Sequence, residues 1–166
     1  MKLQIAGCVA ALSLSIFATG TCADPLAEAL IVAAHNKYRS EVGAPSLHWS
    51  AELAANAQQW ADHLAVLRQL KHSGTPGVGE NLAFGTEGHM SLTQLIDLWA
   101  NERQRFQDGP FPSVSVNGDW QSVGHYTQMV WKGTTEVGCG VASGGGNEYL
   151  VCQYSPQGNV AGEKAY

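Results

Sequence analysis

Histidine is the side chain in this sequence best suited to acid–base or metal chemistry near neutral pH, because its ordinary pKa is about 6.5. The 166-residue chain contains six histidines: His35, His48, His63, His72, His89 and His125. None of the common catalytic or metal signatures is present, since the chain has no HExxH, CxxC, GxSxG, P-loop or GxGxxG. Spacing alone therefore does not say which histidines are functional.

One carboxylate stands out because of the helix that we expect to carry it. The motif at 91–94, SLTQ, predicts a capping box at a helix start. The apolar face of this helix would consist of Leu92, Leu95, Trp99 and Phe106. Glu102 falls on the same face, where an ionised carboxylate needs a cation, a histidine or a metal as partner. A slightly rotated helix, with Glu102 at the edge of the stripe, is the open alternative.

Two further helices are expected upstream. Asp24-Pro25 is typical of a helix start, with Asp as N-cap and Pro at the first helical position. Gly43 is a suitable stop for this first helix. A second helix is predicted from Ser50, because apolar residues then recur at helical spacing. That stripe comprises Leu53, Ala57, Trp60, Leu64 and Leu67.

After residue 120 the apolar period changes to two, which favours strands. We expect strands at His125–Trp131, Val137–Ala142 and Glu148–Tyr154, and a short one at Val78–Phe84. The glycine-rich segment 143–147 reads as a turn between the last two strands. Helices followed by strands indicate one α+β domain in which helices cover a sheet.

The first 23 residues predict a signal peptide. Lys2 precedes a mostly apolar, uncharged stretch at 3–18, and residues 21–23 (TCA) resemble a signal-peptidase site. A membrane anchor needs about 20 apolar residues, and this stretch is shorter and interrupted. We therefore expect a mature chain from Asp24 that is secreted, either extracellular or periplasmic.

The cysteine count supports an exported protein. Cleavage after residue 23 would remove Cys8 and Cys22 and leave Cys139 and Cys152. These two lie equally far from the centre of the predicted turn, so they should face each other across the hairpin. A disulfide between them is typical of an oxidising compartment.

Charge and composition exclude several classes of protein. The net charge is −5, or −6 once Lys2 is removed, so a generic nucleic-acid binder is not expected. Apolar residues make up 45% of the chain, which argues against disorder. No second apolar run is long enough to span a membrane. We expect residues 24–166 to form a single monomeric domain.

Four blocks of sequence, taken together and in order, resemble the CAP superfamily of cysteine-rich secretory proteins, antigen 5 and pathogenesis-related protein 1. The blocks are HNKYR at 35–39 with LHW at 47–49; HS at 72–73 with GENLA at 79–83; Trp99 and Glu102 with GHYTQMVW at 124–131; and CQYSPQGN at 152–159. The last two are the most specific, and the resemblance covers nearly all of residues 26–162.

The resemblance implies a three-layer α-β-α sandwich with a central antiparallel sheet (an SCP domain). It also implies a cleft lined by His72, Glu80, Glu102 and His125. On this basis we expect His72 and His125 to bind zinc or another divalent cation, with Glu80 and Glu102 supporting the cleft. Imidazole suits zinc, and two carboxylates beside it favour a divalent charge.

A loop at 107–123 is the candidate for lipid contact, because some relatives bind sterols or fatty acids through apolar loops or grooves. Its apolar residues are Phe111, Val114, Val116 and Trp120. The alternative is that these residues simply cover the core.

Three functional classes remain in play. The first is an exported, non-enzymatic module that binds a metal and a lipid, a sterol or a protein target. The second is a metal-dependent hydrolase or protease in which Glu80 or Glu102 is the base; Ser73 beside His72 is a weaker nucleophile candidate. The third is an interaction protein in defence or in host–microbe contact. Binding ranks first, because no complete catalytic motif is present.

Overall fold

The structure, a computed structural model, describes residues 24–166; the expected signal peptide 1–23, with Cys8 and Cys22, lies outside them. The helices are α1 (Pro25–Glu41), α2 (Ala51–Leu67), α3 (Leu92–Ala100) and α4 (Gly124–Val130), with short 3-10 turns η1 (Asn101–Arg105) and η2 (Trp120–Ser122). The strands are β1 (His48–Trp49), β2 (Gly79–Thr86), β3 (Glu136–Gly144) and β4 (Asn147–Ser155).

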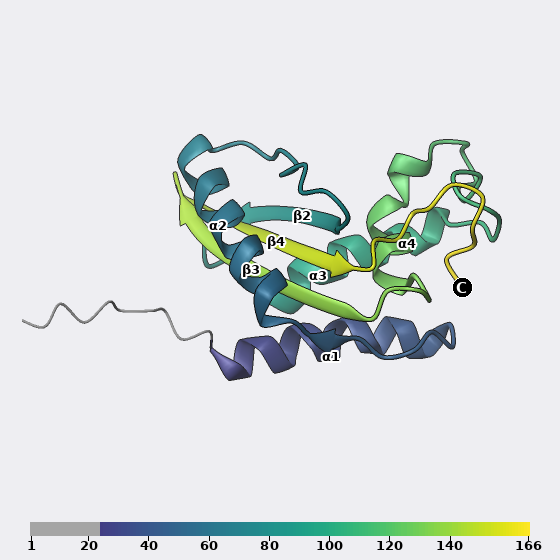
Figure 1. Cartoon of the computed structure of the whole chain (residues 1–166). Helices are drawn as coiled ribbons and strands as arrows, with labels where there is room; N and C mark the ends of the chain where they lie inside the picture. The colour runs from purple at the N-terminus through teal and green to yellow at the C-terminus, as the bar shows by residue number, and fades with distance from the viewer. Residues whose placement is uncertain (1–23) are drawn as a thin grey trace, which may run out of the picture.

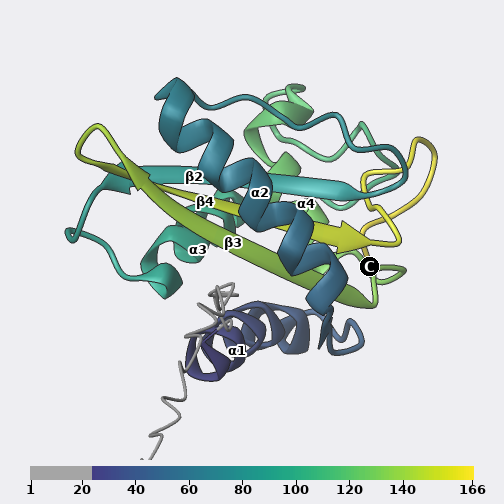
Figure 2. The ribbon, with the colours of Figure 1, turned by 60° about the vertical axis from the view of Figure 1, so that its left-hand side comes forward.

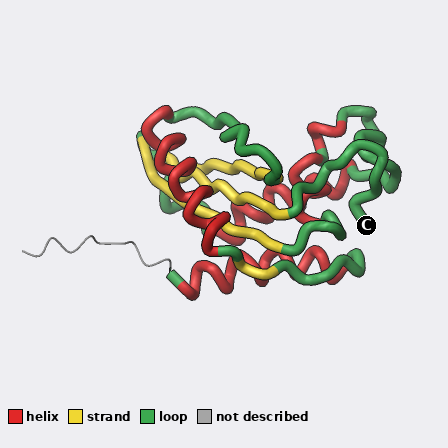
Figure 3. Tube along the Cα trace, viewed as in Figure 1, coloured by secondary structure: helices red, strands yellow, loops and turns green. Residues whose placement is uncertain are grey.

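The four strands form one sheet between two layers of helices (Figures 1 and 2). The strand order is β1-β3-β4-β2, and β2, β4 and β3 pair antiparallel. The two-residue strand β1 pairs with β3 in parallel, so the sheet is mixed. Helix α2 crosses one face, while α1, α3 and α4 pack together on the other side (Figure 3). The expected α-β-α sandwich is confirmed.

Alternation along β4 divides the interior into two cores. Leu150, Cys152 and Tyr154 belong to the larger core, which α1, α3 and α4 cover. Tyr149 and Val151 face the other way, into a smaller core beneath α2. This strand is buried on both faces, as expected for the middle of a three-layer domain.

The helix starts follow their sequence signals. Asp24 accepts a hydrogen bond from the backbone N–H of Leu26, and Ser50 accepts one from that of Leu53. Ser91 and Gln94 form the predicted capping box at the start of α3. The turn between β3 and β4 is also confirmed: Gly145 and Gly146 have φ of +63° and +80°, which glycine adopts without strain.

The disulfide between Cys139 and Cys152 is confirmed, and the two residues are directly paired across β3 and β4. Glycine also lets α2 approach the sheet closely. A Cβ at Gly138 or Gly140 would overlap the backbone of α2.

The strand predicted at His125–Trp131 is wrong, because this segment forms α4. Tyr126 through Val130 are all buried, so no polar face shows the helical period in the sequence. The third helix is also shorter than its stripe suggested. It ends at Ala100, and Glu102 lies in η1.

Candidate metal and ligand cleft

A cleft of about 360 Å³ lies beside β2 and the start of α4. Its lining consists of His72, Glu80, Asn81, Phe111, Trp120, Gln121, Gly124, His125 and Asn159. His72 comes from the loop after α2, Glu80 from β2 and His125 from α4. The structure therefore brings both predicted histidines to one cleft, although they are 53 positions apart in the chain.

The first pair in the cleft is His72 and Glu80. His72 Nδ1 donates to Glu80 Oε1 over 2.8 Å, and the backbone N–H of Ser73 donates to the same oxygen over 2.9 Å. The carboxylate is 7% exposed and the imidazole 63% exposed. The hydrogen bond to Glu80 raises the pKa of His72 more than partial burial lowers it. Burial raises the pKa of Glu80, but hydrogen bonds from His72, Ser73 and Gln153 outweigh it and leave that pKa low.

The second pair is His125 and Glu102. His125 Nδ1 donates to Glu102 Oε1 over 2.7 Å. Glu102 Oε2 accepts from the backbone N–H groups of His125 and Tyr126 at 3.0 and 3.1 Å. The carboxylate thus fixes both the ring and the first turn of α4. The sequence predicts that Glu102, on an inward face, needs a cation, a histidine or a metal as partner. In the structure that partner is a histidine, His125.

Further residues hold His125 from behind the cleft. The ring of Trp99 stacks on that of His125, with centroids 6.1 Å apart. Asn81 Nδ2 donates to the backbone carbonyl of His125 and also to the hydroxyl of Tyr154, at 3.1 and 3.2 Å. That hydroxyl donates in turn to His35 Nε2 over 2.8 Å, because His35 Nδ1 donates to the Ile31 carbonyl.

This arrangement of the two histidines suits a metal ligand. Histidines that bind metals usually donate their second ring nitrogen to a carboxylate, which fixes the tautomer and orients the free nitrogen. His72 and His125 both donate through Nδ1, and neither Nε2 has a hydrogen-bond partner among residues 24–166. The same residues contain no group of three or more His, Cys, Asp or Glu side chains placed to hold a metal. Any metal here would take two histidine ligands and complete its shell with water or a bound ligand.

The two carboxylates are poorly placed to act as general bases. Glu80 Oε2 accepts from Gln153 Nε2 over 3.2 Å, so both oxygens of each glutamate already accept hydrogen bonds. Each carboxylate is also largely buried, at 7% exposed for Glu80 and 13% for Glu102, so little of either is within reach of a proton in the cleft. Ser73 is not paired with His72 either, because its hydroxyl lies 2.9 Å from that of Thr75. The hydrogen bond from Gln153 to Glu80 was not predicted from the sequence. The available signal was a polar residue within an apolar strand.

The apolar residues of the candidate lipid loop lie in different environments in the structure. Val114 is fully buried and belongs to the core, so the expectation that it contacts lipid is not supported. Val116 is 64% exposed but does not line the cleft. Phe111 and Trp120 pack edge to face, with centroids 5.1 Å apart, and form an apolar wall of the cleft beside the histidines.

Comparison with known proteins agrees with this fold. The family model described as "Cysteine-rich secretory protein family" matches residues 32–154, and the chain belongs to this family, the CAP superfamily. It is 38% identical to "Pathogenesis-related protein PR-1 type" of Sambucus nigra, over 81% of this chain and 79% of that protein. It is also 38% identical to "Venom allergen 5" of Polistes dominula, over 82% and 70% of the two chains.

A solved structure described as "Crystal structure of NaASP2 with Zn2+" superposes with a TM-score of 0.74. It is 26% identical in sequence, and the match covers 89% of this chain and 88% of that one. In the described part of this chain, none of the helices has the length and apolar character needed to cross a membrane.

Proposed function

We propose that this protein is an exported, non-enzymatic binding module whose cleft holds a divalent metal, zinc first, through His72 and His125. The observation that carries the proposal is the matched pair of imidazole–carboxylate hydrogen bonds at 2.8 and 2.7 Å. These bonds supply two oriented ligands and two neutralising charges without a dedicated protein cage. The zinc named in the description of the NaASP2 structure supports this choice of metal.

The carboxylates support binding over turnover. Glu80 and Glu102 each position a histidine, and their side chains are only 7% and 13% exposed, so little of either is open to a substrate or to water. A bound metal would supply Lewis acidity, while Glu80 and Glu102 would hold the rings. The metal-dependent hydrolase therefore remains the second candidate, without an observation that favours it.

The apolar wall of Phe111 and Trp120 suggests what else the cleft takes. It lies next to the two imidazoles, so a ligand with a polar group at the metal could place an apolar part against the wall. A sterol or a fatty acid combines such a polar group with an apolar body. Export through the predicted signal peptide, and a role in defence or host–microbe contact, complete the proposal.

Zinc titration of the purified protein by calorimetry and native mass spectrometry tests the metal site. We expect one zinc per chain in the wild type and none in the double variant His72→Ala/His125→Ala. The matched control is His63→Ala/His89→Ala, which also removes two histidines, both exposed and outside the cleft. Equal zinc affinity in all three proteins would contradict the site. Adding a sterol and fatty-acid mixture to the spectra shows whether a lipid is retained with the zinc.

A further inference from the structure

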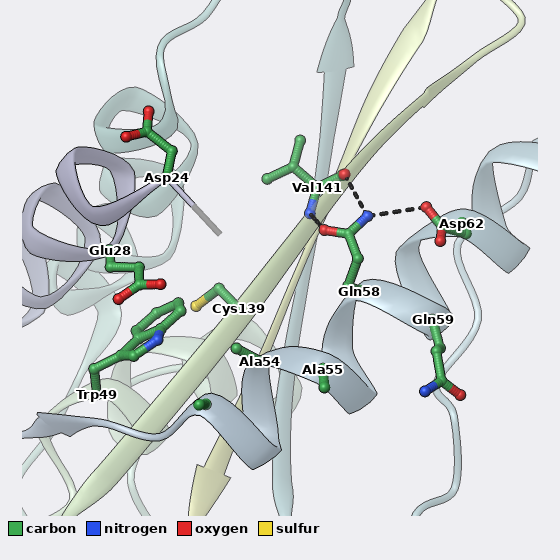
Figure 4. Close-up of a pocket in the computed structure, with 11 residues that line it drawn as sticks. Asp24, Glu28, Trp49, Ala54, Ala55, Gln58, Gln59, Asp62, Cys139 and Val141 are labelled. Carbon is green, nitrogen blue, oxygen red and sulfur yellow. Dashed lines mark hydrogen bonds between the residues drawn. The ribbon is translucent and has the colours of Figure 1, made fainter. Parts of the chain in front are cut away.

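A second and larger depression lies at the opposite edge of the sheet from the cleft. It has a volume of about 720 Å³ and runs between the first turns of α1 and the outer face of α2, over β3 (Figure 4). We call it the edge groove. Its lining consists of Asp24, Glu28, Trp49, Ala51, Ala54, Ala55, Gln58, Gln59, Asp62, Cys139 and Val141. None of these residues belongs to the lining of the cleft.

The edge groove has an apolar floor. Trp49, Ala54 and Val141 lie along it, with the sulfur of Cys139 beside the Trp49 ring (Figure 4). An adjoining depression of about 260 Å³ shares Trp49, Cys139 and Val141 and extends the apolar surface to Ile31 and Leu92. A volume of this order is typical of sites for small organic molecules.

The groove is built into the fold at a free strand edge. Strand β1 pairs with β3 only at Glu136 and Val137, so among residues 24–166 the rest of β3 has no neighbouring strand on that side. Gln58 satisfies this edge by donating to the Val141 carbonyl and accepting from the Val141 N–H, at 2.8 and 3.0 Å. The side chain of Gln58 therefore closes the strand edge to a further strand and leaves a preformed trough.

The charges around the two depressions are all negative. Four carboxylates lie on their rims, Asp24, Glu28, Asp62 and Glu148, and no Lys, Arg or His of the described part of the chain lines either depression. None of the ion pairs within residues 24–166 involves these four carboxylates. Signal-peptide cleavage after residue 23 would add one α-amino charge at Asp24 and leave the other three uncompensated. A concave site with charges of one sign attracts ligands of the opposite sign.

We propose that the edge groove binds a small organic cation, a protonated amine attached to an apolar body. The apolar body would lie over Val141, Ala54 and Cys139. The ammonium group would lie at the rim, between the carboxylates and the indole of Trp49, whose π-face attracts cations. Figure 4 shows the Glu28 carboxyl group and the Trp49 ring on the same side of the groove. The same charges disfavour fatty acids here, so this site differs in ligand class from the lipid proposed for the cleft.

Three probes with one chain length and different head groups test the charge selection: octylamine, octanol and octanoate. We expect the wild-type protein at neutral pH to bind octylamine most tightly and octanoate most weakly, by calorimetry. Added salt should weaken the binding of octylamine and leave the binding of octanol almost unchanged, because salt screens exposed charges. Amide chemical shifts should move at Ala54 and Val141. Tighter binding of octanoate, or shifts confined to Gly124 and His125, would overturn the proposal.

A charge-neutral variant tests the carboxylates directly. Asp62→Asn keeps an oxygen that can accept the 2.9 Å hydrogen bond from Gln58, and Glu28→Gln keeps the size of the side chain. In the double variant we expect octylamine affinity to fall by roughly twofold to fivefold for each carboxylate, as for exposed ion pairs, with octanol binding unchanged. The control, Glu52→Gln/Glu87→Gln, removes two exposed carboxylates outside the groove and should bind as the wild type does. Unchanged octylamine affinity in the first variant would contradict the proposal even if the wild type binds.

Discussion

At the scale of single residues, burial in the core keeps His35 without a proton at neutral pH. His35 is fully buried in α1, between the Ile31 carbonyl and the Tyr154 hydroxyl. Burial lowers its pKa from 6.5 to about 4, and the nearby charge of Arg39 acts in the same direction. The ring is therefore neutral at pH 7, and both of its nitrogens are held by hydrogen bonds inside the core. The core position of His35 explains why a residue type suited to catalysis is structural here.

His35 makes the stability of the protein depend on pH. Because its pKa is lower in the folded state, the unfolded chain binds more protons between pH 6.5 and 4, and stability falls as pH falls through that range. From pH 7 to 5 the loss from this residue is about 2 kcal/mol. In His35→Gln, which does not titrate, the loss between these pH values should be smaller by that amount. Urea unfolding at both pH values measures it, and His89→Gln, at an exposed position, should match the wild type.

At the scale of elements, the sequence predicts the helices and strands that have a periodic apolar face or a capping motif. The start of α3 followed from Ser91 and Gln94, and the β3–β4 hairpin followed from its glycines and alternating strands. Helix α4 did not, because all of its 7 residues except His125 are buried, so no polar face marks the helical period. Sequence also placed Glu102 on an inward face, but only the fold shows that His125, 23 positions away, is its partner. Contacts of that range come from packing, which a periodic pattern does not contain.

The disulfide stabilises the β3–β4 hairpin, whose strands form the centre of the sheet. It joins two residues 13 positions apart in the chain, which on the chain-entropy model gives about 3 kcal/mol. The free energy of unfolding of the double variant Cys139→Ala/Cys152→Ala should be lower by about that much. It should not change further when a reductant is added. The midpoints of urea unfolding with and without dithiothreitol test this. A wild-type midpoint that does not move on full reduction would contradict the expected contribution.

At the scale of the whole molecule, one buried cation, Arg39, links α1 by hydrogen bonds to residues 129–134. Arg39 is fully buried, yet burial lowers its pKa only to about 10, so it stays charged at neutral pH. Its guanidinium donates to the carbonyls of Met129 and Trp131, both at 2.9 Å, and to that of Thr134 at 2.8 Å. Those carbonyls belong to the last turn of α4 and to the segment after it, 90 to 95 residues later in the chain. The same α4 carries His125, so Arg39 also fixes one wall of the cleft.

We therefore expect Arg39→Met to destabilise the whole domain rather than one segment of it. The change keeps an unbranched side chain but leaves the carbonyls of Met129 and Thr134 without a donor, each worth about 1–3 kcal/mol, while the Trp131 carbonyl keeps the N–H of Thr134. Even with partial relaxation, we expect the loss of stability to exceed about 2 kcal/mol, and the displacement of α4 to weaken zinc binding. The matched control is Arg103→Met. It removes the exposed ion pair to Glu41 and a cation–π contact with the Tyr38 ring, and should cost about 1 kcal/mol. Urea unfolding with tryptophan fluorescence compares the two, and equal stability would mean that the buried carbonyls find other donors.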